Sequence, residues 1–148
     1  MSSEYEKLGA SASKAGLHQA LKDSGLSESK NYFAQVFPDS AGDNSYRSFL
    51  HCDGAGTKSV VAYLMYRETG DARWFRGLAQ DALVMNLDDC LCLGPAEGMM
   101  LANAIARNSK LVPDEALREI FIGYRECVQT LAAHGISLQL AGGETADT

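Results

Sequence analysis

The segment from Pro113 to Gly135 limits the possible folds most, because it predicts one long helix with a single apolar face. A proline and two carboxylates stand in its first turn, where a missing N–H is tolerated and negative charge is favourable. The apolar residues recur at helical spacing and are Leu117, Ile120, Phe121, Tyr124, Val128 and Leu131. A helix with such a stripe must bury it against a second layer of structure.

Strand-type sequence lies before and after this helix. Residues 46–52 are rich in aromatic and apolar side chains and stand between a turn cluster and an Asp-Gly pair. Residues 136–140 form a short apolar run, and residues 99–106 are a weaker candidate. We also expect a strand at residues 90–93, separated from the next one by Gly94-Pro95.

Three further helices are expected. Residues 59–66 follow a glycine-rich turn and lead to Gly70, which is typical of a helix with a glycine stop. Asp71 is a suitable N-cap for a second helix, on which we expect Trp74 in the core. The apolar face of that helix consists of Phe75, Leu78, Ala79, Ala82 and Met85. A shorter helix with a weak face is expected at residues 17–26.

Strands and helices therefore alternate without an internal repeat. This order predicts an α+β fold of two layers, in which helices cover a mixed sheet. The 148 residues fit one domain. Residues 1–45 are the least patterned and are expected to form an N-terminal arm and loop region, whereas residues 46–148 are expected to form the α/β domain.

Charge and composition exclude several classes of partner. The net charge of −6 provides no broad positive field, so nucleic acid is not expected, although a few N–H groups or a bound cation can still hold a phosphate. No stretch approaches the roughly 20 apolar residues of a membrane span, and the first residues lack the apolar core of a signal peptide, which predicts a cytoplasmic protein. Reduced, buried thiols are expected at Cys52, Cys90, Cys92 and Cys127, which form no Cys-x-x-Cys pair.

Three segments combine backbone turns with groups that bind phosphate or cations. They are Asp53-Gly-Ala-Gly-Thr-Lys58, Asn86-Leu-Asp-Asp89 and Gly142-Gly-Glu-Thr145, and each is expected to be a turn after an apolar strand or helix. Glycines let a ligand approach the backbone, a following helix start directs N–H groups at an anion, and Lys58 would add a point charge. The first segment alone is equally well a structural turn, and it is neither a Walker A loop nor a Rossmann fingerprint.

Asp88 and Asp89 stand at the end of a predicted helix, where carboxylates oppose the helix dipole. A magnesium ion would compensate, since it typically binds one or two carboxylates together with phosphate oxygens. A solvated acidic turn is the other interpretation. The histidines, His18, His51 and His134, are not strong catalytic candidates, and His134 suits a helix C-terminus.

In this order and spacing, the three segments resemble the aminoimidazole ribonucleotide synthase family, also called phosphoribosylformylglycinamidine cyclo-ligase. The family signature is an Asp-Gly-Val-Gly-Thr-Lys turn, then Met-x-x-Asn-Asp, then Gly-Gly-Glu-Thr-Ala. The corresponding segments here are Asp53–Lys58, Met85–Asp89 and Gly142–Ala146. Related enzymes that make selenophosphate, thiamine diphosphate or formylglycinamidine ribonucleotide share parts of this pattern.

The resemblance implies an ATP-dependent ligase, in which phosphoryl transfer activates the formyl oxygen of an amidine substrate and an internal nitrogen then displaces it. Expected magnesium ligands are Asp53 and Asp89, with Asp88 as a candidate for an extra ligand; Asp53, Lys58 and Asp89 are the expected catalytic residues. Lys58 and the N–H groups of Gly54, Gly56 and Thr57 would contact phosphate, and Gly142, Gly143, Glu144 and Thr145 would line the nucleotide site. Family members are homodimers whose N-terminal domains join their sheets, with ATP near that interface.

The sequence departs from the family pattern in three places. Gly9-Ala-Ser-Ala-Ser13 replaces Gly-Val-Asp-x-Asp, which leaves Ser11, Ser13 and Lys14 as candidates for phosphate contact. Asp88-Asp89 replaces Asn-Asp and adds one negative charge. Family members carry a second domain after the last motif, so the resemblance covers half of the enzyme, as a fragment or a stand-alone domain. A sibling enzyme of the superfamily and a non-catalytic dimerisation or regulatory module are the alternatives.

Overall fold

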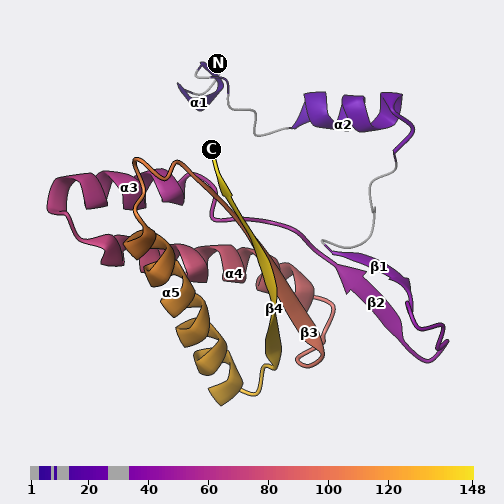
Figure 1. The fold of residues 1–148 in the computed structure, drawn as a ribbon. Coiled ribbons are helices and arrows are strands. Elements are labelled where there is room, and N and C mark those ends of the chain that lie inside the picture. Colours follow the sequence, from indigo (N-terminus) through magenta and orange to yellow (C-terminus); the bar gives the residue numbers. More distant parts are fainter. Residues whose placement is uncertain (1–3, 8, 10–13, 27–33) are drawn as a thin grey trace. The chain divides into compact units, whose positions relative to one another are not determined.

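The computed structural model describes residues 4–7, 9, 14–26 and 34–148, which fall into two compact units, Met1–Tyr32 and Phe33–Thr148 (Figure 1). The described part of the first unit contains α1 (Glu4–Lys7) and α2 (Ala15–Asp23). The helix expected at residues 17–26 is thereby confirmed. No residue of α2 is buried, in keeping with its weak apolar face.

The second unit contains the remaining helices and strands. In chain order they are β1 (Gln35–Pro38), β2 (Arg47–Leu50), α3 (Lys58–Thr69), the 3-10 helix η1 (Ala72–Phe75), α4 (Arg76–Leu91), β3 (Met99–Arg107), α5 (Asp114–Ala133) and β4 (Leu138–Asp147). The predicted α+β class is confirmed. The strands at residues 46–52, 99–106 and 136–140 and the helix after Pro113 are also confirmed, with small shifts of their ends.

The described strands form two pairs instead of one continuous sheet. β1 and β2 are antiparallel, and the connection between them is shaped by Asp39, whose carboxylate accepts hydrogen bonds from the N–H groups of Ala41 and Asp43 at 2.9 and 3.2 Å. β3 and β4 are parallel, and α5 provides the crossover between them. Such a crossover is required because parallel strands cannot be joined by a short hairpin. β1 lies within residues 1–45, where an arm and loop region with a short helix, but no strand, was expected.

Local sequence explains where the helices begin and end. Gly70 ends α3 with a left-handed φ of 70°, and its N–H donates to Tyr66 O at 2.7 Å. Asp71 caps η1 as expected, because its carboxylate accepts the Arg73 N–H at 2.9 Å. α5 starts after Pro113 and is followed by Gly135, with a φ of 79°.

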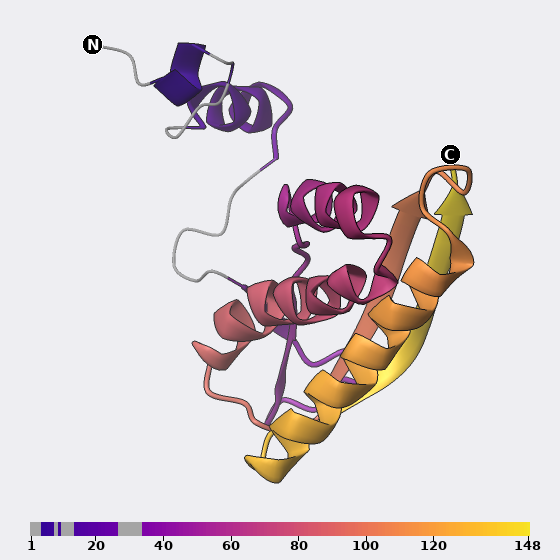
Figure 2. The ribbon, with the colours of Figure 1, turned by 90° about the vertical axis from the view of Figure 1, so that its left-hand side faces the viewer.

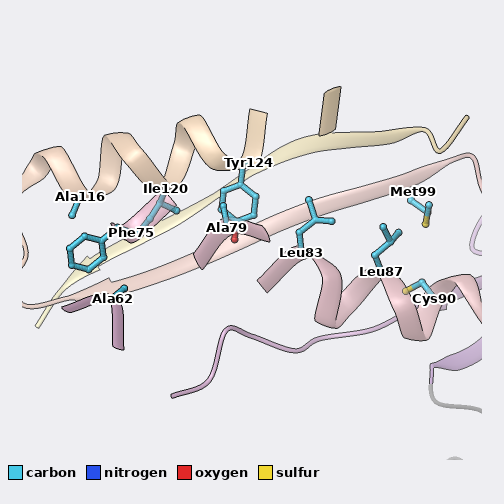
Figure 3. Close-up of a cluster of buried hydrophobic side chains, with 10 residues drawn as sticks. All are labelled: Ala62, Phe75, Ala79, Leu83, Leu87, Cys90, Met99, Ala116, Ile120 and Tyr124. Atoms are coloured by element: carbon cyan, nitrogen blue, oxygen red, sulfur yellow. The ribbon is translucent and has the colours of Figure 1, made fainter. Parts of the chain in front are cut away.

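The core lies where α3, η1, α4 and α5 meet one face of β3. Figure 3 shows its buried side chains, which are Ala62, Phe75, Ala79, Leu83, Leu87, Cys90, Met99, Ala116, Ile120 and Tyr124. Leu101 and Ile105 of β3 and Leu138 of β4 pack against this cluster. Figure 2 shows α5 lying along the β3–β4 pair, so the predicted layer of helices on strands is present.

α4 and α5 approach each other closely at Gly123. A Cβ atom on Gly123 would lie 2.3 Å from the Arg76 carbonyl oxygen and 2.9 Å from the Ala79 Cβ. An ion pair reinforces the same crossing, since the Arg76 guanidinium contacts Glu119 Oε2 at 2.6 Å and Glu126 Oε1 at 3.3 Å. A glycine is therefore required where the two helix backbones meet.

The strand expected at residues 90–93 is wrong. α4 continues to Leu91, and turn hydrogen bonds follow, with Leu93 N–H donating to Cys90 O at 3.0 Å. The apolar run extends the buried helix face formed by Ala79, Leu83, Leu87 and Cys90, and a short apolar run does not by itself distinguish helix from strand.

Several predicted core positions are instead exposed. Trp74 is 46% exposed, and its indole N–H donates to Thr69 Oγ1 at 3.0 Å, while the neighbouring Phe75 is buried. Met85 and Phe121 are 44% and 47% exposed, because the buried faces of α4 and α5 are narrower than the apolar stripes. Cysteines 52 and 92 are also exposed, Cys90 is buried and Cys127 is partly buried, all as free thiols.

No helix in the described ranges is both long and apolar enough to cross a membrane.

Candidate functional site

The loop from Asp53 to Thr57 connects the end of β2 to the start of α3, as the sequence predicts. Gly56 has a φ of 57°, a conformation that favours glycine, and a Cβ on Gly54 or Gly56 would meet no atom within 4 Å. The surface above these two glycines is therefore open. Thr57 precedes the first turn of α3, and within the described residues its N-terminus has no side-chain cap, which is the arrangement a helix uses to bind an anion through N–H groups.

Asn86 on α4 holds the beginning of this loop. Its Oδ1 accepts the Asp53 N–H at 2.8 Å, and its Nδ2 donates to Asp53 O at 2.9 Å. The same Nδ2 donates to Ala82 O, one helical turn earlier, at 2.8 Å. The amide thus pairs with both backbone groups of Asp53 and fixes this residue against α4.

His51 connects Asn86 to Asp89. Its Nδ1 lies 3.3 Å from Asn86 Oδ1, and its Nε2 lies 2.9 Å from Asp89 Oδ2. Both neighbours offer acceptor oxygens to the two ring nitrogens. The His51 side chain is 13% exposed and that of Asp89 is 34% exposed. The backbone of Asp53 and the carboxylate of Asp89 are therefore joined through two side chains.

This network adds a partner at the acidic helix end. We expected a cation to compensate Asp89 near the C-terminus of α4, and the structure places His51 beside the same carboxylate, while the cation stays a prediction. Asp88 is exposed. Adjacent helical residues point about 100° apart, so the carboxylates of Asp88 and Asp89 leave α4 in different directions, and a role of Asp88 as an extra ligand stays a prediction.

Lys58 is paired with an acid from α4. Its Nζ lies 2.6 Å from Asp81 Oδ1, and the two side chains are 56% and 31% exposed. An ion pair this accessible to water contributes little to stability, typically about 0–1 kcal/mol, because water screens it. Lys58 is the first residue of α3, where a phosphate is expected. Because its pair with Asp81 is weak, replacing Asp81 by a phosphate oxygen would cost little free energy.

The donor atoms suit magnesium better than a softer metal. Asp53 and Asp89 offer carboxylate oxygens, of which Asp53 Oδ1 already accepts the Gly54 N–H at 2.7 Å and Asp89 Oδ2 contacts His51. In the described ranges, no three His, Cys, Asp or Glu side chains cluster closely enough to hold a metal by themselves. Two carboxylates completed by phosphate oxygens and water fit the ordinary coordination of magnesium, which needs no all-protein cage.

Gly142, Gly143, Glu144 and Thr145 belong to a strand, so the expectation of a turn is wrong. They lie in β4 and pair with β3 from Asn103 onwards, after a register irregularity. Gly142 has a φ of 94° at that irregularity, and a Cβ on Gly143 would lie 2.2 Å from Asn103 O. The strand structure therefore explains both glycines: Gly142 forms a bulge, and Gly143 lies too close to the Asn103 backbone for a side chain.

These four residues are exposed, and in the described part of the chain they do not belong to the hydrogen-bond network of His51, Asn86 and Asp89. Their role in lining a nucleotide site stays a prediction.

In the N-terminal arm, Ser11 and Ser13 lie outside the described residues. Lys14 precedes α2 in a left-handed conformation, with a φ of 50°.

Sequence reasoning missed the roles of His51, Asn86 and Asp81. Asn86 stood within a recognised motif but received no role, and His51 directly precedes the Cys-Asp-Gly turn. The partners that define these roles lie 23 to 38 positions away along the chain, and residue type alone does not reveal such pairs.

Residues 36–148 match the family described as AIR synthase related protein, N-terminal domain. This chain belongs to that family. The match begins within β1 and includes β2, β3, β4, the helices α3 to α5 and the loop from Asp53 to Lys58. Members of the AIR synthase superfamily are ATP-using enzymes, and their reactions range from purine biosynthesis to selenophosphate synthesis and hydrogenase maturation. No curated protein matches the chain.

Proposed function

We propose that this chain is the ATP- and magnesium-binding N-terminal domain of an aminoimidazole ribonucleotide synthase. The proposal rests on one observation. Asn86 and His51 form a hydrogen-bond network that connects the backbone of Asp53, in the loop before α3, to the carboxylate of Asp89 on α4. The motifs in Asp53–Lys58 and Gly142–Ala146 favour the cyclo-ligase within the family.

In the proposed reaction, the formyl oxygen of formylglycinamidine ribonucleotide takes the terminal phosphoryl group of ATP, and ADP leaves. The internal nitrogen then attacks the formyl carbon, the oxygen departs as phosphate, and loss of a proton gives aminoimidazole ribonucleotide. Bound ATP would supply the phosphoryl group, and bound magnesium would neutralise part of its negative charge. Such a transfer needs positioning and electrostatic stabilisation more than a protein nucleophile.

The residues of the chain would divide this work. Asp53 and Asp89 would hold the magnesium ion, with Asp88 as the candidate for an additional ligand. Lys58 would leave Asp81 and pair with a phosphate oxygen, while the N–H groups of Gly54, Gly56 and Thr57 would bind further phosphate oxygens. Gly142–Thr145 are proposed to line the nucleotide site, from the strand position described above.

Calorimetric titration of ATP into the full chain, with and without magnesium, tests the proposal. Asp53→Asn and Asp89→Asn should each sharply raise the magnesium concentration that ATP binding requires, because each removes a charged oxygen ligand. Glu97→Gln, which neutralises an exposed acid in the loop before β3, is the matched control and should bind like the unaltered chain. Unchanged magnesium-dependent binding in both aspartate variants would exclude the site. Turnover of formylglycinamidine ribonucleotide, compared with the substrates of sibling enzymes, distinguishes the cyclo-ligase from its relatives.

We also propose that the domain forms a homodimer through the open face of β3 and β4. Parallel strands are ordinarily covered on both faces, whereas the outer face of β3 carries exposed Met100, Ala102, Ala104 and Ala106. A charge introduced by Ala104→Lys should convert a dimer to a monomer in light scattering, while Arg118→Ala on the exposed side of α5 should not. A monomeric unaltered chain would refute this part of the proposal.

Calorimetry and light scattering also distinguish the proposed enzyme domain from a non-catalytic module. A dimerisation module predicts a stable dimer without detectable nucleotide binding. The four free cysteines agree with a reducing compartment, and a cytoplasmic location is part of the proposal.

A further inference from the structure

Asn86 is the residue through which α4 controls the position of Asp53. Three hydrogen bonds of 2.8 to 2.9 Å use both ends of its amide, and His51 makes a longer fourth contact at 3.3 Å. Because the Asp53 N–H must meet an oxygen, this contact also determines which amide atom of Asn86 is the oxygen and which is the nitrogen. The side chain is partly buried and its rotation is fully determined by its partners.

Two of these bonds go to one residue. The N–H and the C=O of Asp53 both pair with the amide of Asn86, in the manner in which a residue pairs through both of its backbone groups with the residue opposite it in an antiparallel sheet. Such a double contact fixes the backbone of Asp53 in both position and orientation. The carboxylate of Asp53 is itself exposed, and its Oδ1 accepts the N–H of the next residue, Gly54, at 2.7 Å, so the position of the backbone at Asp53 determines where the carboxylate lies.

The spacing on α4 then relates Asp53 to Asp89. Asn86 and Asp89 are three residues apart, which puts them on the same helix face. His51 spans them, touching Asn86 through Nδ1 and Asp89 through Nε2. One face of α4 thus carries Asp89 itself and, through Asn86, holds the backbone of Asp53.

We propose that Asn86 is a positioning residue that sets Asp53 relative to Asp89 for binding of a divalent cation. The inference rests on the proposed function, because it takes these two carboxylates as the ligands. Asn86 itself touches neither the cation nor ATP. Loss of residues that orient metal ligands typically lowers metal affinity by about 10- to 100-fold, and we expect an effect of that size.

Asn86→Leu and Asn86→Ala in the full chain are the test variants. Leucine has nearly the shape of asparagine and keeps the packing, while it removes all the polar contacts. The magnesium concentration that gives half-maximal ATP binding should rise about 10- to 100-fold in both variants. In the metal-free chain, hydrogen exchange at the Asp53 amide should become faster, because its acceptor has gone.

A control separates positioning from loss of stability. Ile120→Val trims a buried α5 side chain outside the network and lowers the stability of the chain modestly, as the loss of hydrogen bonds also does. It should leave the magnesium requirement unchanged. If Ile120→Val raises that requirement as much as Asn86→Leu does, the effect comes from stability and the proposal is overturned.

A double-mutant cycle shows whether Asn86 acts through Asp53. If it does, adding Asn86→Leu to Asp53→Asn should change the magnesium requirement by less than about twofold, since the residue being positioned no longer carries its charge. Full additivity of the two effects would overturn the proposal. Failure of the unaltered chain to bind ATP with magnesium would instead refute the proposed function, whereas normal binding by both Asn86 variants would refute only the positioning role.

Discussion

Gly123→Ala should destabilise the chain although alanine is the better helix former. In a helix interior this change ordinarily gains about 0.5–1 kcal/mol. At Gly123 the new Cβ would lie 2.3 Å from the Arg76 carbonyl oxygen, whereas ordinary contact begins near 3.4 Å. The obstacle is backbone, so α4 and α5 must separate by about 1 Å. Overpacking of a core typically costs about 1–3 kcal/mol, and the shift would also disturb the Arg76–Glu119 pair.

The net expected loss is about 1–2 kcal/mol, which corresponds to a fall in Tm of roughly 3–10 °C for a domain of this size. Thermal unfolding followed by circular dichroism measures it. Gly77→Ala on α4 is the matched control, because its Cβ would meet no atom within 4 Å. That variant should be as stable as the unaltered chain or slightly more stable. A Gly123→Ala variant with an unchanged or higher Tm would show that the two helices do not cross closely at this point.

Two further predictions concern the lysine of the loop and a core thiol. Lys58→Ala should weaken ATP binding about tenfold or more while lowering the free energy of unfolding by less than about 1 kcal/mol, since its pair with Asp81 is exposed; Asp81→Asn should retain binding. Equal loss of binding in both variants would contradict a role of Lys58 at phosphate. Burial raises the pKa of the Cys90 thiol, so iodoacetamide should modify exposed Cys52 first, and equal rates in the folded chain would contradict this. Because the unfolded chain releases the Cys90 proton at lower pH than the folded chain, the free energy of unfolding should decline as the pH rises past the ordinary thiol range.

The sequence predicted the elements whose signals are local. The helix after Pro113 combines first-turn carboxylates, a repeating apolar stripe and a terminal glycine, and α5 has these bounds within about one residue. Gly70 and Asp71 likewise mark a helix end and a helix start that the structure contains. Caps and periodicity act over a few residues, so they remain visible without knowledge of the fold.

The sequence predictions were wrong where contacts with distant parts of the chain determine the secondary structure. Residues 90–93 are apolar enough for a strand, and only the continued burial of the face through Cys90 makes them helical. Gly142-Gly143 resembles a turn in sequence, yet the strand pairing with β3 turns the first glycine into a bulge and the second into a close contact with Asn103. In both cases the deciding contacts come from another part of the chain.

The arrangement of the 53–58 loop shows how one helix can prepare a binding site without closing it. Asn86 fixes the loop at Asp53, and Asp81 contacts it at Lys58, so α4 holds both ends. Between these contacts, a Cβ on Gly54 or Gly56 would meet open space. The Asp53 end is fixed by hydrogen bonds to a helix of the core and the Lys58 end begins α3, so the glycine segment between them is the part that can adjust to a ligand. Binding then orders only the few residues between the two contacts, which lowers its entropic cost. The first contact fixes Asp53, where a cation is expected, and the second is an exposed ion pair that a phosphate can replace. The two ends of the loop therefore suit different parts of a magnesium–nucleotide complex, the cation at the fixed end and the phosphate at the exchangeable one.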